Sequence, residues 1–166
     1  MHDRRIVIHH VLAAVDTSSR VHGVVRAAAD LASRFGASIT LFRVISVPPE
    51  FPAAAANDGG DFLAPKMIAE ATRSLKAIAV AENVVAAIRV DVAVEPWRGI
   101  VAAADETHAD AIVVGSHTYG FLDRIFGTNS ANVANHAHCM VVVVHEPVVT
   151  GLDVLASDGR RGIAAP

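Results

Sequence analysis

Short apolar runs alternate with amphipathic helical patterns from one end of this 166-residue chain to the other. The run at residues 111–115 is the most restrictive, because Ile and Val fill it with no polar residue between them. A strand without polar alternation is buried on both faces, as at the centre of a parallel sheet. Parallel strands need a crossover, usually a helix, between them. The sequence therefore predicts one α/β domain, an open doubly wound parallel sheet of about five strands with helices on both faces.

The predicted elements follow one another in regular alternation. Strands are expected at residues 6–15, 38–45, 88–94, 111–115 and 140–144, and helices at residues 21–35, 65–83, 98–108 and 128–137. Asp16, Thr17 and Ser18 are predicted to cap the first helix, and Gly36 to end it. That helix is expected to bury one stripe of apolar residues: Val21, Val24, Val25, Ala28, Leu31, Ala32 and Phe35. Residues 47–63 are expected to form a flexible loop, either a cover over a site or a plain surface excursion.

The charge balance and the cysteine count exclude several classes of protein. The formal net charge is −3 and no stripe of Lys and Arg is visible, so no nucleic-acid partner is expected. The single Cys139 excludes an internal disulfide framework and is compatible with a reducing cytoplasm. No run approaches the roughly 18 to 20 apolar residues that a membrane span needs. We therefore expect a cytoplasmic protein without a membrane partner.

The first apolar stretch bears a weak likeness to a signal peptide, because Arg4 and Arg5 precede it. His9 and His10 interrupt the stretch, however, and no convincing small-residue cleavage site follows. It is interpreted as the first strand.

The carboxyl ends of two predicted strands are the places to search for a site. In open α/β sheets, ligands bind at this edge, where the strand order reverses. The edge holds Asp16 and its polar neighbours after the first strand, and the loop that follows Gly115. Gly115 lets a ligand approach the backbone, and Gly127 with Thr128 opens a helix whose N–H groups favour an anion. The loop is not a Walker A motif, because the Gly-Lys-Ser/Thr ending is missing.

Three segments flank or precede this loop in a pattern typical of one family. They are residues 11–18, 109–117 and 135–144. With the glycine loop, they give the chain a resemblance to the universal stress protein family over roughly residues 6–145, whose signature is Gly-x2-Gly-x9-Gly-Ser/Thr between the fourth strand and the fourth helix. The resemblance implies a Rossmann-like sheet with strand order 3-2-1-4-5, a stress-protein domain over residues 1–146 and a flexible tail over residues 147–166.

The resemblance also implies which residues hold a nucleotide. ATP-binding members of the family use the aspartate of the first strand and the glycine loop for ribose and phosphates, and the end of the second strand faces the adenine. Carried over, Asp16 lies near the ribose or a metal ion such as Mg²⁺, and Val44 lies near the base. The implied site for ATP, or for another adenine nucleotide, consists of Ala14, Val15, Asp16, Val44, Gly115, Ser116, His117, Thr118, Gly120, Gly127, Thr128 and Asn129.

The glycine loop departs from the family signature in two ways. Eleven residues separate Gly115 from Gly127, where the signature has twelve. The middle glycine is absent: its position falls on Thr118 counted from Gly115 and on His117 counted from Gly127, and Gly120 is offset. Two functions therefore stay open. One is a stress-response regulator that binds ATP or another adenine nucleotide in this loop, and the other is a nucleotide-free dimeric module for protein interactions.

The last strand suggests how the chain associates with itself. In the implied strand order this strand is an edge, and an exposed apolar edge favours aggregation unless something covers it. The same strand of a second copy covers it symmetrically, and the family commonly dimerises in this way. We therefore expect a homodimer through Val141, Val142, Val143 and Val144.

No catalytic or metal-binding residue is predicted. His117 lies in the loop, but nothing in the sequence indicates a nucleophile or a triad around it, so any ATP hydrolysis is expected to be slow and incidental. His136, His138 and Cys139 span a helix-to-strand junction, so their side chains point in different directions. They are interpreted as a polar helix end that runs into a buried strand. Trp97 is interpreted as a packing residue.

Overall fold

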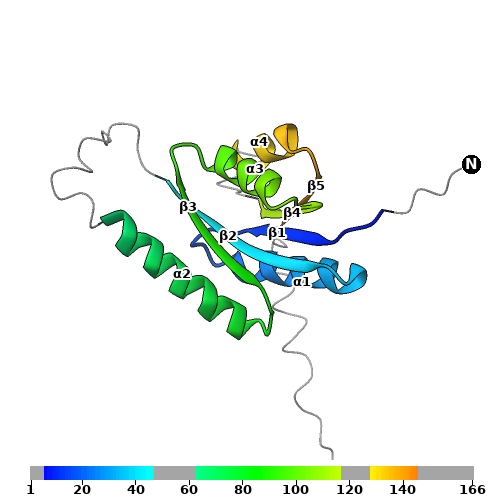
Figure 1. Cartoon of the computed structure of the whole chain (residues 1–166), viewed down its shortest axis with the longest axis horizontal. Coiled ribbons are helices and arrows are strands. Elements are labelled where there is room, and N and C mark those ends of the chain that lie inside the picture. Colours follow the sequence, from blue (N-terminus) through cyan, green and yellow to red (C-terminus); the bar gives the residue numbers. More distant parts are fainter. Residues whose placement is uncertain (1–5, 47–62, 117–127, 146–166) are drawn as a thin grey trace, which may run out of the picture.

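The computed structural model describes residues 6–46, 63–116 and 128–145, which form a five-stranded sheet in the order β3-β2-β1-β4-β5 (Figure 1). Every strand pairs in parallel with its neighbours. The strands are β1 (His10–Ala14), β2 (Ser38–Ser46), β3 (Ala87–Ala93), β4 (Ala111–Gly115) and β5 (Met140–Val144). The helices are α1 (Val21–Phe35), α2 (Leu63–Ala81), α3 (Pro96–Glu106) and α4 (Thr128–His136). The doubly wound sheet predicted from the alternating pattern, and the strand order implied by the resemblance, are both confirmed.

The sheet separates two hydrophobic cores, because successive side chains on a strand point to opposite faces. Val11 and Ala13 of β1 pack in one core with α1 and α2, and neither is exposed to solvent. Leu12 and Ala14 pack in the other core with residues of α3 and α4. Figure 1 shows this arrangement, with α1 and α2 on one side of the sheet and α3 and α4 on the other.

The first strand begins four residues later than expected, at His10 instead of Ile6. Ile6 and Val7 are 63% and 59% exposed, because the neighbouring strands β2 and β4 begin opposite His10 and the residue after it. The carboxylate of Asp110 marks this boundary. It accepts the N–H groups of His9 and His10 at 2.7 and 3.0 Å, which fixes the chain where it enters the sheet.

The start of α1 differs from the prediction, and its end agrees. The N-cap is Arg20, without a side-chain cap, so the prediction that residues 16–18 cap the helix is wrong. Asp16 Oδ1 instead accepts the N–H and the hydroxyl of Ser18, at 2.9 and 2.6 Å, in an Asx-type turn that leads into the helix. Gly36 ends the helix in the left-handed region, with φ of 67°, as expected. Phe35, expected in the buried stripe, is the last helical residue and is 42% exposed.

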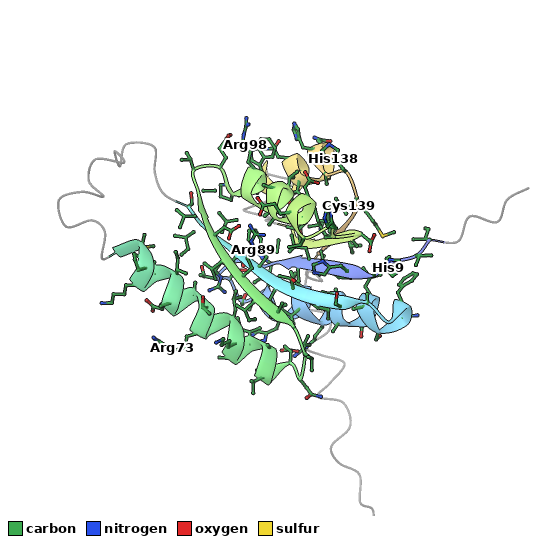
Figure 2. All side chains as sticks on the ribbon, in the orientation of Figure 1. His9, Arg73, Arg89, Arg98, His138 and Cys139 are labelled. Atoms are coloured by element: carbon green, nitrogen blue, oxygen red, sulfur yellow. The ribbon has the colours of Figure 1, made fainter. Side chains whose placement is uncertain are left out.

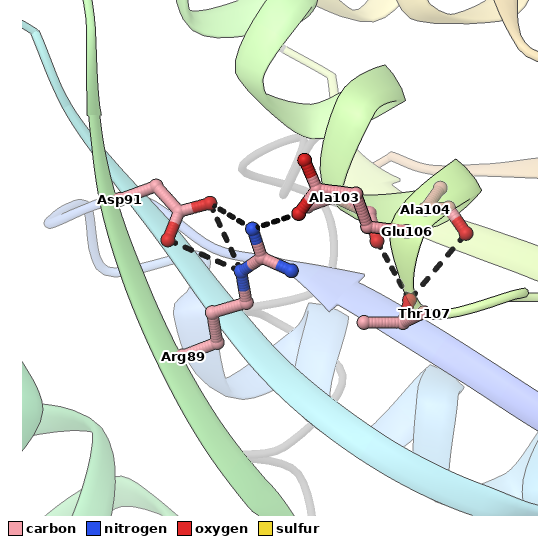
Figure 3. Close-up of polar contacts among 6 residues, drawn as sticks. All are labelled: Arg89, Asp91, Ala103, Ala104, Glu106 and Thr107. Atoms are coloured by element: carbon pink, nitrogen blue, oxygen red, sulfur yellow. Dashed lines mark hydrogen bonds and ion pairs between the residues drawn. The ribbon is translucent and has the colours of Figure 1, made fainter.

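Charged side chains connect the helices to each other and to the edge of the sheet. Glu82, just after α2, accepts His22 Nδ1 and Arg26 Nε of α1 at 2.7 and 2.6 Å. On the other face, Arg89 of β3 bonds Asp91 of the same strand at 2.6 Å and Glu106 of α3 at 2.5 Å (Figure 3). These contacts fix α1 against α2 and α3 against the outer strand.

The boundaries of α3 are set by a proline. Pro96 occupies the first turn, where its missing N–H removes no helical bond, so the helix begins two residues before the predicted position. The predicted loop over residues 47–63 lies outside the described residues except for its last residue, which begins α2. The predicted tail over residues 147–166 also lies outside them. Among the helices that are described, none has the length and apolar character needed to cross a membrane.

Candidate functional site

A cleft of about 170 Å³ opens at the carboxyl edge of the sheet, where β1 and β4 part and the strand order reverses. This is the position at which open α/β sheets bind ligands. We call it the switch-point cleft. It is lined by Ala14, Val15, Asp16, Arg20, Val24, Phe42, Val44, Pro96, Ile100, Val114, Gly115, Asn129 and Ser130.

The structure brings half of the predicted site residues together in this cleft. They come from the ends of three strands and from the first turn of α4: Ala14, Val15, Asp16, Val44, Gly115 and Asn129. Ser116 does not line the cleft; it is 3% exposed, and its N–H donates to the carbonyl of Val144 at 2.9 Å. Thr128 is the first residue of α4, and only its backbone is described. The other predicted residues lie outside the described residues: His117, Thr118, Gly120 and Gly127.

One wall of the cleft is apolar. Phe42 and Val44 of β2 lie two residues apart, so they share a face of the sheet, and Ile100 of α3 stands opposite. Gly99 allows this close packing: a Cβ at that position would lie 3.0 Å from Val44 Cγ2 and would have to displace it. An apolar group is the chemically suitable occupant of such a wall.

The other end of the cleft is polar. Asp16 contributes a carboxylate at the end of β1, and Asn129 and Ser130 lie in the first turn of α4. A helix N-terminus carries unpaired N–H groups and a partial positive charge, which attract an anion. Arg20, the N-cap residue of α1, adds a cationic side chain to the lining. The cleft therefore offers an apolar wall, an acceptor for hydroxyl groups and an environment for an anion.

The glycine at the end of β4 has a steric role that can be read from the structure. A Cβ on Gly115 would come within 3.2 Å of Val24 Cγ2 on α1, which is closer than most side chains tolerate. A larger residue here would separate β4 from α1 or turn into the cleft. The prediction that the absence of a side chain at Gly115 matters thus has a packing reason beside the proposed approach of a ligand.

Several lining residues were missed by the sequence reasoning. Phe42 could have been found from Val44, since residues two apart on a strand face the same way. Arg20 follows the polar turn after β1, but its place in the cleft depends on how that turn is folded. The remaining missed residues line the cleft only because the fold packs their helices and strands around it. They are Val24, Pro96, Ile100, Val114 and Ser130.

The histidines and the cysteine at the end of α4 have structural partners. The rings of His136 and Trp97 are in tilted contact with centroids 4.5 Å apart, and Trp97 packs against the core between the sheet and α3. Figure 2 shows His138 and Cys139 after α4. His138 Nδ1 lies 3.4 Å from Asp105 Oδ1, and burial raises the pKa of the Cys139 thiol. In the described ranges, no group of three His, Cys, Asp or Glu side chains is placed to hold a metal ion. His10 bonds the Thr107 carbonyl and the Thr40 hydroxyl, at 2.9 and 2.8 Å.

Comparison with known sequences identifies related proteins. The model of the universal stress protein family matches residues 8–145. Universal stress protein A homolog 1 of Coxiella burnetii is 26% identical over 142 residues, which cover 81% of this chain and 94% of that protein. The family model therefore spans every strand and helix that the structure describes.

Comparison with solved structures agrees. UspA from Lactobacillus plantarum superimposes with a TM-score of 0.68 at 20% identity, covering 84% of this chain and 99% of that one. A universal stress protein in complex with cAMP gives a TM-score of 0.59 at 23% identity, with 85% and 99% coverage. A universal stress protein from Archaeoglobus fulgidus in complex with dAMP gives a TM-score of 0.53 at 28% identity, with 84% and 98% coverage.

Proposed function

This chain belongs to the universal stress protein family, and on that premise we propose that it is a cytoplasmic stress-response regulator that binds ATP or another adenine nucleotide in the switch-point cleft. The observation that carries the proposal is the pairing of an apolar wall at Val44 with the Asp16 carboxylate and the N-terminus of α4, all in one cleft. Two related structures hold adenine nucleotides, cAMP in one and dAMP in the other.

Each part of a nucleotide has a chemically suitable place in this arrangement. The adenine lies against the wall formed by Phe42, Val44 and Ile100, where its flat ring is removed from water. The ribose hydroxyls donate to the Asp16 carboxylate, the acceptor nearest to the end of β1. The first phosphate faces the N-terminus of α4 beside Asn129, where backbone N–H groups favour a negative charge.

The possible ligands differ in their number of phosphates, and so in the donors that they need from the protein. cAMP and dAMP each carry one phosphate, whereas ATP carries three and needs more donors, or Mg²⁺, to offset the added charge. In the family signature those donors belong to the loop over residues 117–127, which is one residue shorter here. A comparison of ATP with AMP therefore measures what that loop contributes, and a comparison with adenosine measures what the phosphate contributes.

The test is isothermal titration calorimetry with ATP, AMP, cAMP and adenosine, with and without Mg²⁺. Asp16→Asn removes the charge but keeps an oxygen that accepts the bonds from Ser18, so the turn is preserved. Replacing a charged acceptor by a neutral one is expected to weaken nucleotide binding roughly tenfold. The matched control is Asp30→Asn, an exposed carboxylate on α1.

Two results would contradict the proposal. One is equal nucleotide affinity for the wild type and Asp16→Asn. The other is the absence of binding to the folded protein at millimolar nucleotide, which would favour the nucleotide-free interaction module instead.

We also propose that two copies pair through β5. This strand is an edge of the sheet, and Val141, Val142, Val143 and Val144 are only partly buried. Along a strand, N–H groups alternate between the two sides, so of Val142→Pro and Val143→Pro one loses a bond to β4 and the other a bond across the edge. Sedimentation equilibrium should show a dimer for the wild type and a folded monomer for the outward-facing variant. A monomeric wild type at tens of micromolar would refute the pairing.

A further inference from the structure

A second cavity, of about 300 Å³, lies on the opposite face of the sheet from the switch-point cleft. Arg43 follows Phe42 on β2 and points to the other side, toward α1 and α2. We call this space the Arg43 cavity. Beside Arg43, the residues that matter for its chemistry are Ser18, Ser19, His22 and Ser74.

Arg43 is a buried cation with unused hydrogen-bonding capacity. Its residue is 7% exposed, although guanidinium groups normally stay in water. Nη2 donates to the backbone carbonyl of Asp16 at 2.9 Å, and Nη1 lies 3.4 Å from the hydroxyl of Ser74. Nε is fully buried and has no hydrogen-bond partner in the part of the chain that the structure describes. Both partners that Arg43 has among the described residues are neutral oxygens.

This environment is unfavourable for the charge by itself. Burial lowers the pKa of Arg43, and the negative charge of Asp16 opposes that shift only in part. Arginine still remains protonated at neutral pH. A buried charge with an unused donor is stabilised by any anion that reaches it, because the attraction is stronger away from water.

The surroundings of Arg43 can supply the remaining contacts of an oxyanion. Ser19 and Ser74 carry hydroxyl groups on two sides of the cavity, and the N-terminus of α1, a helix of 15 residues, borders it at Val21. The carboxylates near the cavity are already engaged. Asp16 accepts two bonds from Ser18, and Glu82 is held by Arg26 and His22. These bonds reduce the repulsion that an incoming anion would meet.

We propose that the Arg43 cavity binds a small tetrahedral oxyanion of the phosphate or sulfate class, with the guanidinium group of Arg43 and the hydroxyl of Ser74 as its donors. The site is separate from the nucleotide, because Arg43 and Val44 lie on opposite faces of the sheet. It does not depend on whether the switch-point cleft holds a nucleotide.

The experiment is a titration of ¹⁵N-labelled protein with inorganic phosphate, followed by the side-chain Nε–H resonance of Arg43, with chloride at equal ionic strength as the reference. Arg43→Met keeps an unbranched stem in place of the side chain and removes the charge; since an apolar group replaces a buried cation, the variant is expected to fold. Ser74→Ala removes one donor. The matched control is Arg73→Met, an exposed arginine of α2 whose side chain points away from the sheet (Figure 2).

Saturable shifts of the Arg43 Nε–H and of the Ser74 amide are expected with phosphate and not with chloride. Phosphate affinity, measured from amide shifts of residues 18 and 19, should fall at least roughly tenfold in Arg43→Met, a few-fold in Ser74→Ala and not at all in Arg73→Met. No shift at tens of millimolar phosphate would overturn the proposal. So would a shift with AMP but not with phosphate, because the anion would then be the nucleotide's own.

Discussion

Arg43 Nη2 donates to the carbonyl of Asp16 across 2.9 Å, which joins β2 to the turn that follows β1. One residue earlier, the N–H of Val15 donates to the carbonyl of Phe42 at 2.9 Å, so the two chains stay in register beyond the end of β1. Asp16 consequently borders the switch-point cleft and the Arg43 cavity at the same time. A change in its charge is felt on both faces of the sheet.

Asp16→Asn is therefore expected to change the two proposed affinities in opposite directions. Nucleotide binding weakens roughly tenfold, because the ribose hydroxyls lose a charged acceptor. Phosphate binding in the Arg43 cavity strengthens, because a negative charge beside it is removed. Titrations of the same protein sample with AMP and with phosphate measure both effects. A loss of both affinities would show that the substitution disturbs the turn itself.

Two helical glycines are expected to respond oppositely to alanine. A Cβ on Gly23 of α1 meets nothing within 4 Å, so Gly23→Ala should raise the free energy of unfolding by roughly 0.5–1 kcal/mol through reduced chain entropy. A Cβ on Gly99 of α3 would lie 3.0 Å from Val44 Cγ2 and 3.3 Å from Ala93 Cβ. Gly99→Ala should lower the free energy of unfolding by about 1 kcal/mol, since overpacking exceeds the gain in helix propensity.

Urea denaturation gives both values, and ATP titration gives a second readout. Displacement of Val44 by Gly99→Ala should also weaken nucleotide binding, whereas Gly23→Ala should leave the nucleotide affinity unchanged. Equal stabilisation by both substitutions would mean that α3 can move away from β2 without penalty.

The contacts of Glu82 predict an acid-dependent loss of stability. The hydrogen bond from Arg26, and after it the one from His22, lower the pKa of Glu82. A carboxyl group whose pKa is lower in the folded state stabilises the fold fully above its unfolded pKa, and the stabilisation disappears as the pH falls through the folded value. Glu82→Gln should thus be less stable than the wild type at pH 7, and the difference should shrink as the pH falls below about 4.

The measurement is the urea midpoint of both proteins between pH 7 and pH 2.5. Glu70→Gln serves as the control, because Glu70 is an exposed carboxylate of α2. A pH-independent difference between Glu82→Gln and the wild type would show that the contacts to α1 act through packing and not through charge.

Leu75 is the residue by which α2 is most deeply anchored, with no exposure to solvent. Leu75→Ala should lower the free energy of unfolding by about 2–5 kcal/mol, through lost burial and the cavity left behind. Met67→Ala on the same helix, where the residue is 45% exposed, should change it by less than about 0.5 kcal/mol. Since the switch-point cleft lies on the other face of the sheet, nucleotide affinity of the folded Leu75→Ala protein should be unchanged. Reduced affinity would show that the two cores are coupled.

The interior of the sheet was predictable because its strands carry an unambiguous pattern. The position of β4 follows from its apolar run, and the end of α1 follows from Gly36. Both depend on local chemistry, and both were predicted correctly. The start of β1 was not, because Ile6 and Val7 have the composition of a strand and fail to form one only for lack of paired neighbours. Strand pairing is a property of the whole sheet, so it cannot be recognised from the sequence of one segment.

The candidate site was predictable in part for the same reason. Asp16, Val44 and Gly115 stand at strand ends, so the rule for open sheets and the family resemblance both indicate them. Arg43 was missed, because an arginine inside a strand is ordinarily expected at a solvent-exposed edge or face. Its burial depends on α2, whose Ser74 closes the space above it. Only the packed structure reveals that the charge is enclosed.

The bond from the Ser116 N–H to the Val144 carbonyl ties the residue after β4 to the last residue of the edge strand. In a pair of subunits joined along β5, this one peptide group would connect the subunit contact to the residue that follows Gly115 of the cleft. Ligand affinity and self-association would then be thermodynamically linked, each strengthening or weakening the other by the same factor. The ligand affinity would then depend on protein concentration, because dilution separates the dimer into subunits.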